Sequence, residues 1–168
     1  SSAIFIPYIE YLKIKDLIFA SPDVGSTNRV REVAKYFELD MVICDKQRKR
    51  ANEVAEMTVI GEVKGKNVVL IDDICDTAGT LSKAASVLKE RGALSVRAFC
   101  THPVLSGKAY ENIESSELEE LVVCDTIPLK RESEKIKVLP TAELFAVAIR
   151  NAFDNKSISS LFIHKKKK

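Results

Sequence analysis

Short apolar runs alternate with longer segments of helical periodicity along most of this chain. Apolar runs typical of buried strands occur at residues 17–20, 41–44, 68–71, 94–101 and 121–124. Apolar side chains recur at helical spacing in residues 28–37 and 81–91, and further helices are expected at 5–12, 107–113 and 141–153, the last with Thr141 as its cap. Strands that alternate with helices in this way predict a three-layer α/β domain with a largely parallel sheet.

Two other segments have strand character. Residues 57–63 (MTVIGEV) are followed by the turn Lys64-Gly65-Lys66, which predicts an antiparallel hairpin with the strand at 68–71. The basic segment before residue 57 would then project as a loop. A last short strand is expected at 157–163.

The stretch at residues 67–80, NVVLIDDICDTAGT, has the layout of a ligand site. An apolar strand runs into Asp72 and Asp73, then into a loop of small and hydroxyl residues, and then into a helix. Ligands of open α/β sheets bind beyond the carboxyl ends of strands. The loop N–H groups and the helix N-terminus suit a phosphate, and the two carboxylates suit sugar hydroxyls or Mg²⁺. A helix-capping turn made by Asp and Thr is the alternative. The sequence contains no P-loop and no GxGxxG fingerprint.

Two further polar loops follow buried strands, namely SPDVGST at residues 21–27 and DKQRKR at 45–50. Taken alone, the first is a common turn composition, and the second could be a solvated charge run or a nucleic-acid patch. Both gain interest if they meet the central loop at one edge of the sheet. Lys46 and Arg48 could then stabilise charge on a phosphoryl group during transfer, with Arg48 gripping phosphate in a forked geometry.

Composition narrows the class of protein. The 168 residues are expected to form one domain, residues 1–164, followed by a disordered tail of four lysines at 165–168. The 26 basic and 24 acidic residues nearly cancel to +2, so nucleic-acid binding is not expected. No apolar run approaches the roughly 18 residues of a membrane helix.

The four cysteines and the first residues bear on the protein's setting. The cysteines are widely spaced with no CxxC pair, which predicts buried free thiols and a reducing, cytoplasmic setting. The sequence starts Ser-Ser without an initiator Met, so processing or truncation is expected.

VLIDDICDTAGT resembles the phosphoribosyl pyrophosphate motif of type I phosphoribosyltransferase folds. Nearly the whole chain is similar to the C-terminal half of the ribose-phosphate pyrophosphokinase family. The similarity runs from IFIPYIE through SPDVGST, DKQRKRANEVAEM, VVLIDDICDTAGT and THPVLSG to SISSLFIH.

That resemblance implies a reaction and a set of roles. The family transfers the diphosphoryl group of ATP to the 1-hydroxyl of ribose 5-phosphate, giving phosphoribosyl pyrophosphate and AMP, and requires Mg²⁺. Lys46 and Arg48 would be catalytic, and Asp23, Gly25 and Ser26 would form the pyrophosphate loop, with Asp23 binding Mg²⁺. Ribose 5-phosphate would be bound by Arg48, Asp72, Asp73, Asp76, Thr77, Ala78, Gly79 and Thr80.

The resemblance also implies partners, and the chain departs from the family in two ways. Family members carry a preceding half that supplies part of the ATP site, and they assemble as homo-oligomers, here by resemblance a hexamer. That half is missing from this sequence, so the chain alone is expected to turn over poorly. The family usually has Gly-Gly where this chain has Gly25-Ser26, which would cost affinity if the second position needs a positive φ or a close backbone approach. A non-catalytic regulatory homologue and a phosphoribosyltransferase are the alternative functions.

Overall fold

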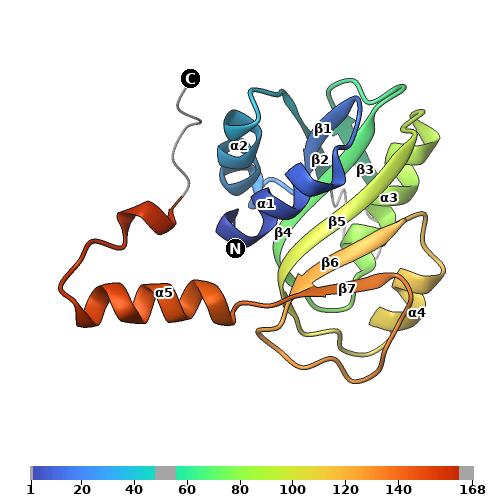
Figure 1. Cartoon of the computed structure of the whole chain (residues 1–168). Coiled ribbons are helices and arrows are strands. Elements are labelled where there is room, and N and C mark those ends of the chain that lie inside the picture. The colour runs from blue at the N-terminus through green and yellow to red at the C-terminus, as the bar shows by residue number, and fades with distance from the viewer. Residues whose placement is uncertain (1, 48–55, 163–168) are drawn as a thin grey trace.

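A computed structural model describes residues 2–47 and 56–162, with the backbone alone for residues 46 and 47 (Figure 1). Its helices are α1 (Ser2–Leu12), α2 (Thr27–Tyr36), α3 (Gly79–Glu90), α4 (Ala109–Glu114), α5 (Ala142–Phe153) and the 3₁₀ turn η1 (Ser159–Leu161). Its strands are β1 (Leu17–Ser21), β2 (Met41–Gln47), β3 (Glu56–Ile60), β4 (Asn67–Cys75), β5 (Ser95–Pro103), β6 (Glu120–Cys124) and β7 (Ile136–Leu139).

The seven strands of the described ranges form one sheet in the order β3-β2-β1-β4-β5-β6-β7. Every neighbouring pair is parallel except β2 and β3, which are antiparallel. Because β4 lies in the middle, its apolar residues are buried on both faces, and this explains its continuous apolar run. The predicted α/β class with a largely parallel sheet is confirmed.

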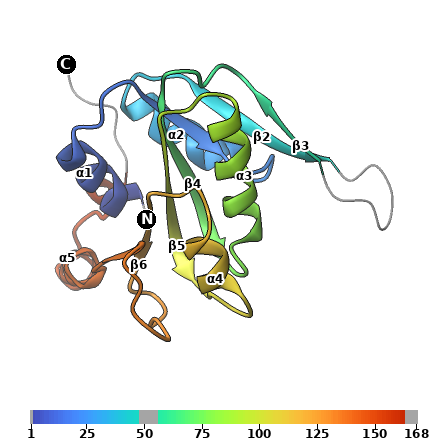
Figure 2. The ribbon, with the colours of Figure 1, turned by 90° about the vertical axis from the view of Figure 1, so that its right-hand side faces the viewer.

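Each face of the sheet carries its own apolar core. Leu70 of β4 packs in the cluster that includes Leu81 and Leu88 of α3 and Ile113 of α4. Its neighbour Ile71 points the other way, into the cluster formed with α1 and α2. Fully burying a side chain of this size stabilises the fold by about 1.5–3 kcal/mol. Helices therefore cover both faces, as Figures 1 and 2 show.

The predicted hairpin between residues 57–63 and β4 is wrong. Both edges of β4 are occupied, by β1 and by β5. β3 instead pairs with β2, with Ile43 opposite Ile60 and Gln47 opposite Glu56. The burial of β3 alternates between exposed and buried side chains, as expected for an edge strand with one solvated face.

The structure also differs from the sequence expectations near the C-terminus. The segment expected as a last strand at 157–163 contains the 3₁₀ turn η1, and β7 was not expected at all. Thr141 holds the N-cap position of α5, as expected, but its hydroxyl donates to Asp125 Oδ1 at 2.7 Å and makes no hydrogen bond to the helix. The lysine tail lies outside the described residues.

The cysteines and the lengths of the helices can be described directly. All four cysteines are free and buried, as predicted. Across residues 2–47 and 56–162, no helix is both long enough and apolar enough to cross a membrane.

Candidate functional site

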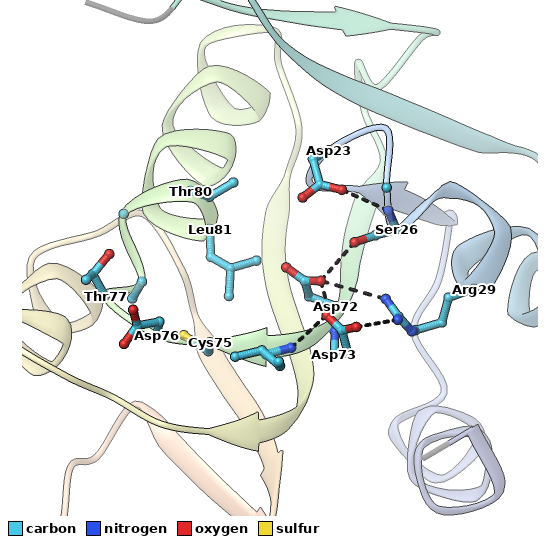
Figure 3. Close-up of a pocket in the computed structure, with 14 residues that line it drawn as sticks. Asp23, Ser26, Arg29, Asp72, Asp73, Cys75, Asp76, Thr77, Thr80 and Leu81 are labelled. Carbon is cyan, nitrogen blue, oxygen red and sulfur yellow. Dashed lines mark hydrogen bonds and ion pairs between the residues drawn. The ribbon is translucent and has the colours of Figure 1, made fainter.

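A cavity of about 430 Å³ opens where the parallel neighbours β1 and β4 end (Figure 3). The loop after β1 forms one wall, and the end of β4 with the following loop and the start of α3 forms the other. The lining residues are Asp23, Gly25, Ser26, Arg29, Asp72, Asp73, Ile74, Cys75, Asp76, Thr77, Ala78, Gly79, Thr80 and Leu81. Ten of the predicted site residues thus surround one cavity, and their roles stay predictions.

The loop after β1 is fixed by its own polar groups. The Ser21 hydroxyl donates to the Asp23 carbonyl at 2.6 Å, and the Ser26 N–H donates to Asp23 Oδ1 at 2.8 Å. Ser26 has φ −81°, a right-handed conformation that a residue with a Cβ adopts without strain. A cost from a positive φ at Ser26 therefore does not arise in this conformation, and a cost from a close backbone approach to pyrophosphate stays a prediction.

Asp72 is the buried carboxylate of the cavity, with 9% of its surface exposed. Its Oδ1 accepts hydrogen bonds from the Ser26 hydroxyl at 2.8 Å and from the Asp73 N–H at 2.9 Å. Burial raises the pKa of Asp72 above its ordinary value, although these hydrogen bonds act in the opposite direction. The hydrogen bond from Ser26 therefore links the loop after β1 to the end of β4 through the buried carboxylate of Asp72.

Arg29 is a cavity residue that the sequence analysis missed. It lies in the first turn of α2, and its Nη2 donates to Asp73 Oδ2 at 2.6 Å, while its Nη1 lies 3.8 Å from Asp72 Oδ1. Burial is the largest single influence on Asp73 and opposes its ionisation, but the Arg29 guanidinium and the hydrogen bonds to the carboxylate together outweigh burial and hold the pKa of Asp73 below its ordinary value. Arg29 thus balances two adjacent acidic side chains, and Figure 3 shows all three together.

The far end of the cavity is a tight loop of residues 76–80. Asp76 and Thr77 lie there, away from Asp23 and Ser26 (Figure 3). Ala78 has φ +60°, a left-handed conformation that is rare for a residue with a Cβ, and α3 begins directly after it at Gly79. The first turn of a helix presents N–H groups without intrahelical acceptors, and this arrangement suits an anion.

Cys75 borders this loop but is a poor nucleophile. It is buried, and burial raises the pKa of its thiol to about 12. The thiolate is the reactive form of cysteine, so the cavity offers carboxylates, hydroxyls and backbone N–H groups as its working chemistry.

Two predicted catalytic residues are not placed by the structure. The backbone of Lys46 pairs with Met57 at the end of β2, and Arg48 lies outside the described residues. β2 runs parallel to β1, so its carboxyl end lies at the same edge of the sheet as the cavity.

The oxygens around the cavity fit Mg²⁺ that shares its ligands with a phosphate. Within the described part of the chain, no three His, Cys, Asp or Glu side chains form a metal cluster. Mg²⁺ is commonly held by one or two carboxylates, several waters and substrate phosphates. Asp23, Asp72 and Asp73 supply carboxylates of that kind.

Known proteins resemble this chain over most of its length. Residues 20–163 match the family model described as phosphoribosyl synthetase-associated domain. A ribose-phosphate pyrophosphokinase from Campylobacter jejuni is 56% identical over 162 residues, which cover 96% of this chain and 52% of that protein. The corresponding protein from Wolinella succinogenes is 52% identical, with the same coverage of 96% and 52%. The chain therefore spans about half the length of the curated relatives it matches.

Solved structures agree with the sequence relatives. The crystal structure of phosphoribosylpyrophosphate synthetase from Mycobacterium smegmatis matches with a TM-score of 0.82 and 31% identity, over 92% of this chain and 51% of that one. Adenine phosphoribosyltransferase from Thermoanaerobacter pseudethanolicus shares the fold, with a TM-score of 0.52 at 15% identity over 72% and 76% of the two chains. This chain belongs to the ribose-phosphate pyrophosphokinase family and corresponds to the C-terminal half of its members.

Proposed function

We propose that this chain is the ribose 5-phosphate-binding half of an enzyme that makes phosphoribosyl pyrophosphate. The 1-hydroxyl oxygen of ribose 5-phosphate would attack the β-phosphorus of ATP, and the bond between that phosphorus and the α,β-bridging oxygen would break. AMP leaves with the bridging oxygen. The observation that carries this proposal is the single cavity that joins a two-carboxylate strand end, a left-handed loop before a helix, and the loop of Asp23 and Ser26.

The two ends of the cavity would bind different parts of the substrates. Residues 76–80 would hold the 5-phosphate, and Asp72 and Asp73 would accept hydrogen bonds from the ribose hydroxyls. Asp23, Gly25 and Ser26 would face the diphosphoryl group. Lys46, near the end of β2, and Arg48, which follows β2 in the sequence, would stabilise charge on the transferring phosphates, and Arg48 would also contact ribose 5-phosphate.

Asp23 would be the metal-binding residue of this loop. Its Oδ1 already accepts the Ser26 N–H, so its second oxygen is the one suited to a cation. Bound Mg²⁺ would neutralise negative charge on the phosphate oxygens. The residues of this chain would orient the acceptor sugar against the diphosphoryl group, and such positioning is most of what a phosphoryl-transfer enzyme contributes.

The reaction can be tested with the chain as it is. The chain would be incubated with ATP, ribose 5-phosphate and Mg²⁺, alone and together with the preceding half of a relative, while AMP is followed. We expect slow AMP formation by the chain alone and faster formation by the mixture. No AMP from a folded, complemented protein would favour a regulatory homologue. Release of pyrophosphate from phosphoribosyl pyrophosphate and a base would favour a phosphoribosyltransferase.

Binding provides a second test that does not depend on turnover. We expect Asp72→Asn to weaken ribose 5-phosphate binding roughly tenfold, because hydrogen bonds to a charged acceptor are lost. Asp40→Asn is the matched control, since Asp40 is exposed and precedes β2 at the opposite edge of the sheet. Calorimetry would measure both variants, and unchanged affinity in Asp72→Asn would remove this carboxylate from the proposed site.

A further inference from the structure

The segment between β5 and the middle of α4 is bonded to the loop at residues 76–80. The Leu105 N–H donates to the Cys75 carbonyl at 3.1 Å, and the Ser106 N–H donates to the Asp76 carbonyl at 3.0 Å. Asn112 Nδ2 donates to the Thr77 carbonyl at 2.9 Å. Three successive carbonyls, at the last residue of β4 and the first two of the loop, are therefore held by a neighbouring segment of the chain.

Holding the carbonyls also orients the N–H groups. The C=O and N–H of a trans peptide unit point in opposite directions. The carbonyls of Cys75 and Asp76 point toward the segment at 105–112, so the N–H groups of Asp76 and Thr77 turn away from it, while the Ala78 N–H is engaged by the Cys75 thiol. Asp76 and Thr77 line the cavity, and this is the side on which an anion would bind.

The side chain of Asp76 is held in the same way. Its Oδ1 accepts a short hydrogen bond from the Ser106 hydroxyl. An unrestrained carboxylate beside a phosphate would repel it, because like charges at close range are unfavourable. Ser106 thus keeps one acidic oxygen of the loop engaged outside the anion's position.

The loop conformation needs this support. Ala78 at φ +60° is a left-handed non-glycine residue, and such residues persist where the surrounding structure holds them. Asn112 makes a hydrogen bond on each side of Ala78 in the sequence. Its side-chain amide donates to the Thr77 carbonyl, and its backbone carbonyl accepts the Ser82 hydroxyl at 3.1 Å. One residue of α4 therefore holds both the loop and the first turns of α3.

We propose that Ser106 and Asn112 are positioning residues that hold residues 76–80 in the conformation that binds the 5-phosphate. They act through the loop and touch no ligand themselves. The inference rests on the proposed function only for the identity of the ligand, since the tethers themselves belong to the free protein.

The test combines calorimetry with hydrogen exchange on the full chain. Ser106→Ala and Asn112→Ala remove one tether each. Ser106→Thr keeps the hydroxyl. Ser115→Ala is the matched control, because the Ser115 hydroxyl donates to the Glu111 carbonyl at 2.7 Å, approaches the Asn112 backbone carbonyl only at 3.5 Å, and does not reach the loop. We expect affinity for ribose 5-phosphate to fall roughly tenfold in the two tether variants and to be largely retained in Ser106→Thr and Ser115→Ala.

Hydrogen exchange separates positioning from a general loss of structure. In the tether variants, amides of residues 75–80 should exchange faster, while amides of β1, β4 and β5 keep wild-type rates. Unchanged loop exchange, or unchanged affinity in both variants, would overturn the inference. Faster loop exchange in a protein whose wild type binds no ribose 5-phosphate would support the tethers and overturn the proposed function instead.

Discussion

Arg29 places one positive charge beside the two adjacent carboxylates of Asp72 and Asp73. Asp72 and Asp73 are adjacent in β4, and two neighbouring carboxylates resist joint ionisation. The guanidinium of Arg29 reaches both, with its shorter contact to Asp73. Asp73 is half exposed, so solvent screens this pair and its contribution to stability is modest.

We expect Arg29→Ala to raise the pKa of Asp73 and to lower the free energy of unfolding at pH 7 by about 0.5–1 kcal/mol. The folded-state pKa of Asp73 is depressed, so its stabilisation is present above the ordinary carboxyl pKa and is lost as the pH falls through the folded value. The difference between variant and wild type should therefore shrink in acid. NMR titration of the carboxyl carbons and urea unfolding at several pH values measure both effects.

Arg31→Ala is the matched control for this experiment. Arg31 lies on the same helix, is exposed, and donates to Asn28 at 3.1 Å. It should leave the Asp73 titration unchanged. An Asp73 pKa that is the same in Arg29→Ala as in wild type would contradict the assigned ion pair.

The buried thiols make a second prediction at the residue scale. Burial raises the pKa of Cys44 and of Cys75 to about 12, and it also raises the pKa of Cys100 and Cys124. At pH 8 only about one part in 10⁴ of a thiol with such a pKa is thiolate. Iodoacetamide should therefore label the native chain slowly at all four cysteines and label it fully in urea, as followed by mass spectrometry. Fast native labelling of Cys75 would mean that the end of β4 opens readily.

The local sequence identified most of the residues that line the cavity, but it did not identify Arg29, whose guanidinium balances the acidic side chains there. Asp23 and Thr77 lie in loops whose composition indicates a turn or a phosphate site, and Asp72 lies near the end of the apolar strand that precedes one of these loops. Arg29 lies on a helix whose pattern indicates only an amphipathic face, and its partner Asp73 is 44 residues away. Its position in the first turn of the helix that follows a site loop was the available signal. The pairing itself depends on β1 and β4 being neighbours.

At the scale of elements, the central strands were predictable and the edges were not. β4 is buried on both faces, so its apolar run indicates a strand without knowledge of its partners. β7 has the sequence IKVL with no fully buried residue, and it becomes a strand by pairing with β6. The Lys64-Gly65-Lys66 turn indicated a local hairpin, whereas β3 found its partner across the sheet in β2. Long-range pairing of this kind has no local signature.

Two glycines near this edge provide a matched pair of substitutions. Gly61 directly follows β3 and has φ +118°, and an added Cβ would lie 2.5 Å from Val42 Cγ1. Gly65 also has a positive φ, +71°, but an added Cβ would meet nothing within 4 Å. Gly65→Ala should destabilise by about 1 kcal/mol through backbone strain alone. Gly61→Ala adds a clash with a buried strand, and we expect about 2–4 kcal/mol. Equal losses in urea unfolding would show that β3 shifts freely over β2.

At the scale of the whole molecule, α5 stands apart from the sheet and its covering helices (Figure 1). None of its residues is buried. Phe145, Ile149 and Phe153 follow one another at four-residue spacing, so they share a face of the helix, and Phe153 is 82% exposed. An apolar face of this kind is unusual on a monomer, since contiguous apolar patches beyond a few hundred Å² mark interaction surfaces.

We expect the isolated chain to self-associate through this face as its concentration rises, which also tests the homo-oligomer that the family resemblance predicts. The double variant Phe145→Ser, Phe153→Ser should associate less, because it removes the two aromatic side chains from the face. Its free energy of unfolding should stay within about 0.5 kcal/mol of wild type, since neither ring is buried in the monomer. Leu94→Ser is the control, because Leu94 is 58% exposed and precedes β5, far from α5 along the chain. Light scattering over a dilution series measures the mass against the 18.7 kDa of one chain. A constant monomer mass, or equal association in both variants, would show that α5 does not drive assembly.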